Sequence, residues 1–75
     1  MAADGAPATV RVLVNGDELD LSLGTTVAEL VEAVCERTRG VAVAIDREVV
    51  PRSSWATVVV TEGSVVEVVA AAAGG

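Results

Sequence analysis

The strongest constraint on this chain is that it contains one segment with helical periodicity, flanked on both sides by extended patterns. The apolar positions of that segment recur at i, i+3, i+4, i+7 and i+8, and they are Val27, Leu30, Val31, Val34 and Cys35. This spacing gives a helix with one apolar face, which needs a sheet to cover it. A ferredoxin-like fold requires a second full helix, so the pattern excludes that fold.

Both ends of the predicted helix carry sequence signals. Thr26, followed three residues later by Glu29, forms a capping box in front of the apolar pattern. At the other end, Arg37 and Arg39 suit the negative end of the helix dipole. Gly40 stands where a left-handed C-terminal cap belongs, so we expect the helix to end there.

A β-hairpin is predicted before the helix. Residues 9–14 have the period-two pattern of a half-buried strand, whose inner face is made by Val10, Val12 and Val14. Asn15-Gly16 follows at once, and this dipeptide favours a type I′ turn. Residues 18–21 alternate again, and we expect Leu19 and Leu21 to face the core.

The chain after the helix predicts further extended segments. Residues 41–45 are apolar throughout, as expected for a central strand covered on both faces. Asp46-Arg47 then turns the chain into a short strand at 48–50, which Pro51 ends. We interpret 51–56 as an irregular or single-turn crossover, 57–60 as extended chain, 62–64 as a turn and 65–69 as the final strand.

This order of elements indicates an α+β protein of the β-grasp, or ubiquitin-like, type: a mixed sheet of four to five strands packed on one main helix. In that arrangement the last strand returns between earlier ones. A chain of 75 residues is one domain at most. We expect the domain at 9–69, a disordered lead-in at 1–8 and a flexible tail at 70–75.

Composition excludes several classes of function. The net charge of −6 repels phosphate backbones and anionic lipid, so we expect neither nucleic acid nor membrane as a partner. With no His and one Cys, the chain has no histidine proton shuttle and no zinc-binding pattern, and we expect no metal and no bound cofactor. Residues 1–7 do not resemble a secretory signal, and no apolar run reaches the ~18 residues of a membrane span, so the expected compartment is the cytoplasm.

The sequence ends in Gly74-Gly75. A frayed terminus is the simplest interpretation, but two residues without a Cβ also thread a narrow channel. From Val69, six residues at ~3.3 Å each extend the terminus by roughly 20 Å, far enough to enter a partner's active site. There ATP would convert the Gly75 carboxylate to an acyl adenylate, and sulfur would replace AMP to give a thiocarboxylate. The chain would then be a protein cosubstrate rather than an enzyme.

Several segments together resemble the ThiS family, the sulfur carriers of thiamine biosynthesis: Val14-Asn15-Gly16, residues 24–30, residues 41–45, Val49-Val50-Pro51-Arg52-Ser53 with Trp55-Ala56, and Gly74-Gly75. The resemblance implies that a ThiF-type enzyme uses ATP to adenylate Gly75. It further implies that a cysteine desulfurase route supplies the sulfur and that thiazole synthase, ThiG, receives it.

Two other functions remain open at this point. The terminal Gly74-Gly75 also resembles that of the molybdopterin synthase small subunit. A small subunit of that kind, which completes another enzyme's active site, is therefore the second hypothesis. A ubiquitin-like interaction domain or protein tag without sulfur chemistry is the third hypothesis. The chain has no Lys, which prevents it from building chains on itself through side-chain amines. The segment from Pro51 to Ala56 favours the thiamine carrier.

Four residues are candidates for further roles. Cys35 is a possible persulfide acceptor, but its place on the apolar face of the helix favours a buried thiol. Trp55 is a possible partner anchor, although we favour a role at the edge of a core that is poor in aromatics. Arg52 either pairs with an acid on a partner or braces the crossover. Leu13 lies on the strand face opposite Val10, and with Val65 and Val69 it is a possible docking surface.

Overall fold

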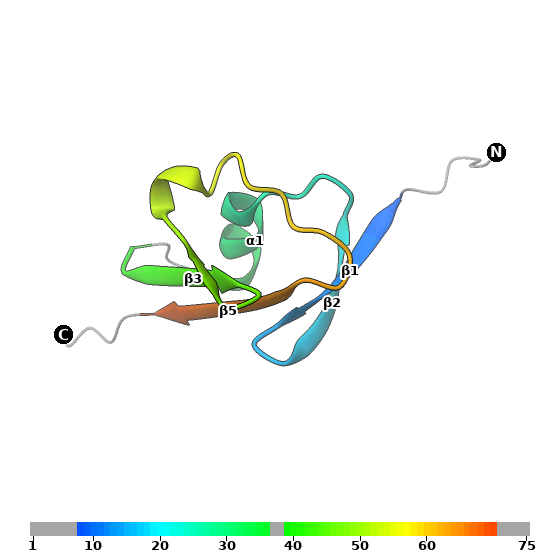
Figure 1. The fold of residues 1–75 in the computed structure, drawn as a ribbon, viewed down its shortest axis with the longest axis horizontal. Helices are drawn as coiled ribbons and strands as arrows, with labels where there is room; N and C mark the ends of the chain where they lie inside the picture. The colour runs from blue at the N-terminus through cyan, green and yellow to red at the C-terminus, as the bar shows by residue number, and fades with distance from the viewer. Residues whose placement is uncertain (1–7, 37–38, 71–75) are drawn as a thin grey trace.

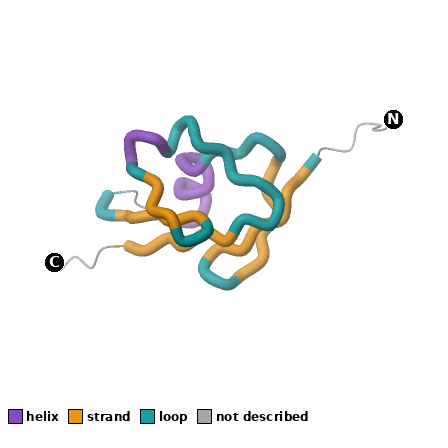
Figure 2. The backbone as a smooth tube through the Cα atoms, in the orientation of Figure 1, coloured by secondary structure: helices purple, strands orange, loops and turns teal. Residues whose placement is uncertain are grey.

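One five-stranded sheet with helix α1 across one face makes up the architecture (Figure 1). The computed structural model describes residues 8–36 and 39–70. Figure 2 shows the same elements along the backbone, together with the long loop that returns to the last strand. In chain order the elements are β1 (Thr9–Val14), β2 (Asp17–Ser22), α1 (Val27–Val34), β3 (Val41–Ile45), β4 (Glu48–Val50), a 3₁₀ turn (Arg52–Ser54) and β5 (Val65–Ala70).

The strand order is β2-β1-β5-β3-β4, so the last strand lies between β1 and β3 (Figure 1). β5 runs parallel to β1 and antiparallel to β3, and the pairs β1–β2 and β3–β4 are antiparallel hairpins. This mixed sheet with one helix confirms the predicted α+β, β-grasp arrangement. The sheet has five strands, the upper of the two numbers expected.

Both hairpin turns use left-handed backbone. Asn15 has φ +52° and Gly16 has φ +88°, and in the second turn Asp46 has +50° and Arg47 has +74°. A two-residue type I′ turn requires a positive φ at both central positions. The hairpin predicted from Asn15-Gly16 and the turn predicted at Asp46-Arg47 are therefore confirmed.

The start of α1 is confirmed in detail. The Glu29 N–H donates to Thr26 Oγ1 at 3.2 Å, and the Thr26 N–H donates to Glu29 Oε1 at 3.0 Å. These reciprocal bonds form the predicted capping box, and they satisfy two backbone donors that the first turn of a helix leaves without partners.

The predicted end of α1 is wrong, because the helix stops at Val34 and Cys35 is already extended, with φ −126°. The last fully buried helix residue is Val31, and Val34 is 41% exposed. Helices of this length are stabilised mainly by packing, so a further turn of polar residues would gain little. Gly40 does have φ +72°, but it belongs to the turn before β3. Arg39 lies in that turn as well, and Arg37 lies outside the described residues.

The core is aliphatic and rich in valine, as the composition requires. Its most buried members come from α1, from β1, β3 and β5, and from the loop between β4 and β5: Val10, Val12, Val14, Val27, Leu30, Val31, Val43, Trp55, Val60, Val66 and Val68. Leu19 and Leu21 pack against this cluster and are half-buried, so their predicted direction is confirmed.

The prediction that β3 is covered on both faces is wrong. Val43 is buried, but Ala42 is exposed and Ala44 is half-buried. α1 covers one face of the sheet, and within the described residues no second layer covers the other (Figure 1). The small size of alanine explains the pattern: an apolar run with alanines on its outer side is compatible with a strand that is covered on one face.

The connection from β4 to β5 is tied to the start of α1. The 3₁₀ turn follows Pro51, and the chain then passes α1, where the Val27 N–H donates to the Val58 carbonyl and the Val60 N–H to the Thr25 carbonyl, each at 2.9 Å. The 3₁₀ turn confirms the predicted single-turn crossover. The extended run predicted at 57–60 is shorter than expected, because Thr57 still lies in a turn and Val59 alone forms an antiparallel bridge, with Thr26. Among the described residues, no helix is long and apolar enough to cross a membrane.

Candidate functional site

The candidate site is the terminus that follows β5. Gly74 and Gly75 lie outside the described residues, as do positions 71–73, so the structure describes the strand from which this terminus continues. β5 ends at Ala70 and has a neighbouring strand on each side. We call residues 71–75 the carrier arm. The described part of the site is therefore the base of this arm, meaning Val68–Ala70 and the groups that hold these residues.

Asn15 holds β5 next to this base. Its backbone N–H donates to the Val66 carbonyl at 2.9 Å. Its side-chain Nδ2 donates to the Val68 carbonyl at 3.0 Å, and its Oδ1 accepts the Val68 N–H at 2.9 Å. The sequence analysis identified Asn15 as a turn residue and missed these bonds, because Asn at a type I′ turn is explained by its positive φ alone.

The second hairpin turn holds the other end of β5. Asp46 Oδ1 accepts the Val65 N–H at 3.0 Å, and the Asp46 backbone N–H donates to the Val65 carbonyl at 2.8 Å. The first residue of each type I′ turn thus bonds to β5 through both its backbone and its side chain. The strand is fixed at its start by one hairpin and near its end by the other.

A cavity of about 300 Å³ lies beside the base of the carrier arm. It lies between the first hairpin, the end of α1 and the end of β5, and its lining is Val14, Asn15, Asp17, Leu19, Val34, Cys35, Val68 and Ala70. Cys35 is half-buried here, not fully buried as predicted, because it caps a helix that ends earlier than expected. It still packs against the core cluster.

The sheet face turned away from α1, called the outer face below, carries a group of exposed aliphatic side chains. Leu13 is half-buried and pairs directly with Val65, which is 44% exposed. Val69, 60% exposed, pairs with Ala42 further along β5. The three residues predicted as a docking surface, Leu13, Val65 and Val69, therefore lie on one face of two neighbouring strands.

Charged residues border this apolar group. Arg11 Nε donates to Asp20 Oδ1 at 2.9 Å, and Arg11 Nη1 lies 3.8 Å from Glu18 Oε1. The hydrogen bond from Arg11, together with its charge, lowers the pKa of Asp20 below its ordinary value. The same hydrogen bond, with the charges of Asp20 and Glu18, raises the pKa of Arg11. Glu67 lies on the outer face between Val65 and Val69.

Arg52 and Trp55 lie on the other side of the sheet from Leu13. Trp55 is 5% exposed and belongs to the core, and its Nε1 donates to the Val50 carbonyl at 3.0 Å. The Arg52 guanidinium stacks over this ring, with Cζ 4.9 Å from the ring centroid. The burial supports the core role that we favoured for Trp55, and the stacking supports a bracing role for Arg52. Leu13, Arg52 and Trp55, the three residues predicted to bind partners, therefore do not form one surface.

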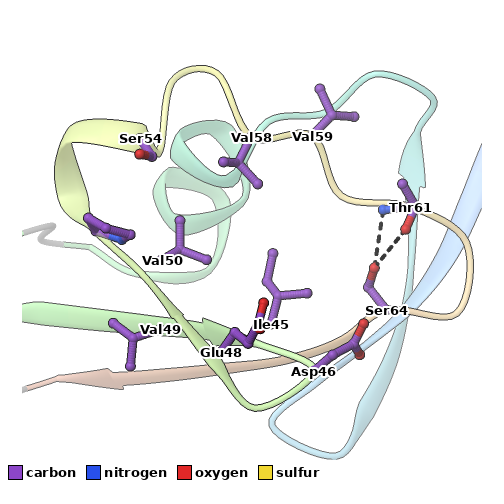
Figure 3. A pocket seen from close by; sticks show the side chains of 11 residues that line it. Ile45, Asp46, Glu48, Val49, Val50, Ser54, Val58, Val59, Thr61 and Ser64 are labelled. Atoms are coloured by element: carbon purple, nitrogen blue, oxygen red, sulfur yellow. Dashed lines mark hydrogen bonds between the residues drawn. The ribbon is translucent and has the colours of Figure 1, made fainter.

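A groove of about 350 Å³ lies between β4 and the loop that follows the 3₁₀ turn (Figure 3). Figure 3 shows acidic Asp46 and Glu48 at one side and the aliphatic Val50 and Val58 around it. In the described part of the chain no group of three His, Cys, Asp or Glu side chains is placed to hold a metal ion. The groove therefore offers apolar contacts and two acids, with no metal-ligating set.

Three comparisons with known proteins agree with one another. The model of the ThiS family matches residues 5–75. The sulfur carrier protein ThiS of Escherichia coli strain K12 is 35% identical over 66 residues, which are 88% of this chain and 100% of that protein. The crystal structure of the thiamine biosynthesis protein ThiS from Geobacter metallireducens superposes with a TM-score of 0.76 at 26% identity, covering 88% of this chain and 100% of that one.

A larger protein shares the same region. A thiazole synthase of Paramagnetospirillum magneticum is 38% identical to this chain over 66 residues. The matched part covers 88% of this chain but 20% of that protein. One fifth of that thiazole synthase therefore resembles the chain described here.

Proposed function

The chain belongs to the ThiS family, and from that premise we propose that it is the sulfur carrier of thiamine biosynthesis and that Gly75 carries the sulfur. The observation that carries this proposal is a family match that runs through the β-grasp domain and on to residue 75, so that Gly74-Gly75 lie within it. The matched proteins are named for thiamine biosynthesis and thiazole synthesis, which favours this role over the molybdopterin carrier and the protein tag.

The chemistry takes place on the main-chain carboxylate. A carboxylate oxygen of Gly75 attacks the α-phosphorus of ATP, and pyrophosphate leaves. A persulfide from the cysteine desulfurase route then attacks the resulting acyl adenylate, and AMP leaves with one of the original oxygens. A thiol supplied by a partner reduces the S–S bond of this acyl disulfide, which leaves the thiocarboxylate on Gly75 and a disulfide on the partner. Gly74 and Gly75 add no side chain around the reacting carbon. The partner enzymes bind ATP and supply catalysis, so the chain acts as a cosubstrate.

Three partners follow from this chemistry. A ThiF-type enzyme in the cytoplasm adenylates Gly75, and a cysteine desulfurase route supplies the sulfur. Thiazole synthase consumes the thiocarboxylate. Support for this last partner comes from the Paramagnetospirillum magneticum thiazole synthase, one fifth of which resembles this chain. A protein that combines both parts indicates that the two act together.

We place the docking surface for the activating enzyme on the outer face. Its aliphatic group is exposed, with Val69 60% and Val65 44% accessible to solvent. An exposed apolar patch with a charged border is typical of an interaction surface. The face also includes Val69, one residue before Ala70, so a partner bound there would lie close to the base of the carrier arm.

The test is the mass of the protein after reaction. We expect that incubation with ATP, a ThiF-type enzyme and a sulfur source replaces one oxygen by one sulfur, and that fragmentation places the change on Gly75. A variant lacking Gly74 and Gly75 is the matched control, and it should gain no sulfur while keeping the thermal transition of the parent. A sulfur located on Cys35, or no mass change where an established carrier reacts, would refute the proposal.

A further inference from the structure

We propose that Asn15 is a positioning residue for the carrier arm: its amide fixes β5 at Val68, so that the residues beyond Ala70 always begin from the same point. This inference rests on the proposed function. It assigns to Asn15 a role beyond forming the first hairpin turn. Asn15 does not touch the reacting carboxylate, and it acts through β5.

The pairing of β5 is unequal on its two sides. On the β3 side, pairing continues from Ile45↔Val66 to Val41↔Ala70. On the β1 side, backbone pairing ends at Val14↔Val66, because β1 turns away into the hairpin. The N–H and carbonyl of Val68 therefore have no strand opposite them on that side. The Asn15 amide bonds to both groups, at 2.9 and 3.0 Å, and so replaces the missing strand for one residue.

A carboxamide is the side chain that this position requires. It presents a donor and an acceptor together, which match the carbonyl and the N–H of Val68. Aspartate would tolerate the turn but would place an oxygen against the Val68 carbonyl. Glycine would suit the φ of +52° equally well but would lose both bonds. Both bonds are partly buried, and they lie beside the cavity lined by Val14 and Leu19.

Loss of these bonds would free the last residues of β5 on the side next to the hairpin. Every residue released from β5 must be ordered again when a partner binds the arm, at an entropic cost. That cost falls on binding and not on the chemical step, so the KM of the activating enzyme for the carrier would rise while kcat stays the same.

The chain provides a matched control in Asp46. It is also the first residue of a type I′ turn, with φ +50°, and its side chain also bonds to β5. Its partner is Val65, at the end of β5 far from the carrier arm. Asp46→Gly therefore removes the same kind of turn-to-strand bond without touching the arm's base. A purely structural role for Asn15 predicts that Asn15→Gly and Asp46→Gly behave alike.

The experiment measures ATP–pyrophosphate exchange by a ThiF-type enzyme with each variant as carrier, at salt high enough to screen the one-charge difference of Asp46→Gly. We expect Asn15→Gly to raise KM about three- to ten-fold, the factor that one or two hydrogen bonds correspond to, with kcat unchanged. Asp46→Gly, whose partner Val65 lies on the outer face but at the far end of β5 from the arm, should raise KM by less than Asn15→Gly does and leave kcat unchanged. Asn15→Asp keeps the turn and should raise KM like Asn15→Gly.

Amide hydrogen exchange gives a second readout that does not depend on activity. The Val68 amide should exchange faster in Asn15→Gly, by more than the amides of β1 do. Equal KM values for Asn15→Gly and Asp46→Gly would overturn the inference, as would a Val68 amide that stays as protected as in the parent. Failure of the proposed function is distinct, because then the parent protein itself would support no exchange of pyrophosphate.

Discussion

The Arg11–Asp20 pair shows what single side chains contribute on the outer face. Both side chains are more than half exposed, so their 2.9 Å contact adds little to folding. It does set a pH dependence. Because the pKa of Asp20 is lowered in the folded state, the pair stabilises the fold above the ordinary carboxyl pKa. That contribution is lost as the pH falls through the lowered value.

Replacing Arg11 should therefore be visible in the titration of Asp20. In Arg11→Thr, which keeps a residue suited to a strand, we expect the pKa of Asp20 to rise toward 3.8, the value for an unperturbed carboxyl. NMR detection of the Asp20 carboxyl carbon during a pH titration measures this. Arg39→Thr is the control, because Arg39 lies outside β1 and β2. A pKa of Asp20 that is the same in the parent and in Arg11→Thr would contradict the assignment.

Cys35 should be dispensable for sulfur transfer. It is half-buried at the end of α1, and Cys35→Val keeps an apolar side chain of similar size there. We expect a change in the free energy of unfolding of about 1 kcal/mol or less, and thiocarboxylate formation at the parent rate. Denaturant unfolding and mass spectrometry measure the two quantities. A folded Cys35→Val protein that accepts no sulfur would show that the thiol takes part.

At the scale of the elements, α1 is short and depends on its first turn. It has eight residues, too few for a helix that is stable by itself in water. Its stability comes from the burial of Val27, Leu30 and Val31 and from the capping box. The box also lies next to the backbone bonds that tie 58–60 to the start of the helix. A change at Thr26 should therefore affect both the start of α1 and the attachment of residues 58–60 to it.

Thr26→Ala tests the capping box. Loss of an N-cap side chain typically costs about 1 kcal/mol, and we expect the free energy of unfolding to fall by about that amount. Chemical denaturation measures the change. Glu32→Ala, on the exposed side of the same helix, is the control and should change stability by less than about 0.5 kcal/mol. Equal effects of the two substitutions would mean that the box contributes nothing.

Elements that are specified by neighbouring residues were predicted well. The turns at Asn15-Gly16 and Asp46-Arg47 and the start of α1 at Thr26 depend on local chemistry, and the structure confirms all three. The end of α1 was wrong because it depends on where the core stops, which no local pattern records. The bonds from Asn15 to Val68 were missed for a similar reason: the partner lies far along the chain.

At the scale of the whole molecule, charge is the main long-range property. The net charge of −6 is spread over a small domain, and acids such as Glu67 and Asp20 lie close to the apolar group on the outer face. Charge of one sign mainly steers encounter with a partner and adds less to final affinity. An activating enzyme that receives this carrier should therefore present a basic surface.

Salt should weaken the encounter. Ions screen exposed charges beyond a Debye length of ~8 Å at physiological ionic strength, so we expect the KM for the carrier to rise with added salt while kcat changes little. Steady-state kinetics over a series of sodium chloride concentrations measures this. The KM for ATP in the same reactions is the control for a general effect on the enzyme. A carrier KM that is independent of salt would show that charge does not guide docking.

The place of β5 in the sheet also determines how the domain is assembled. Each hairpin closes through a turn of two residues, so both can form quickly and separately. β1 and β3 are not neighbours, and β5 is the strand that joins one hairpin to the other. Since β5 follows all the other strands in the chain, a nascent polypeptide on the ribosome holds two unconnected hairpins until it arrives. The sheet and the base of the carrier arm are thus completed in one step, so a carrier that has failed to fold also lacks a correctly placed arm.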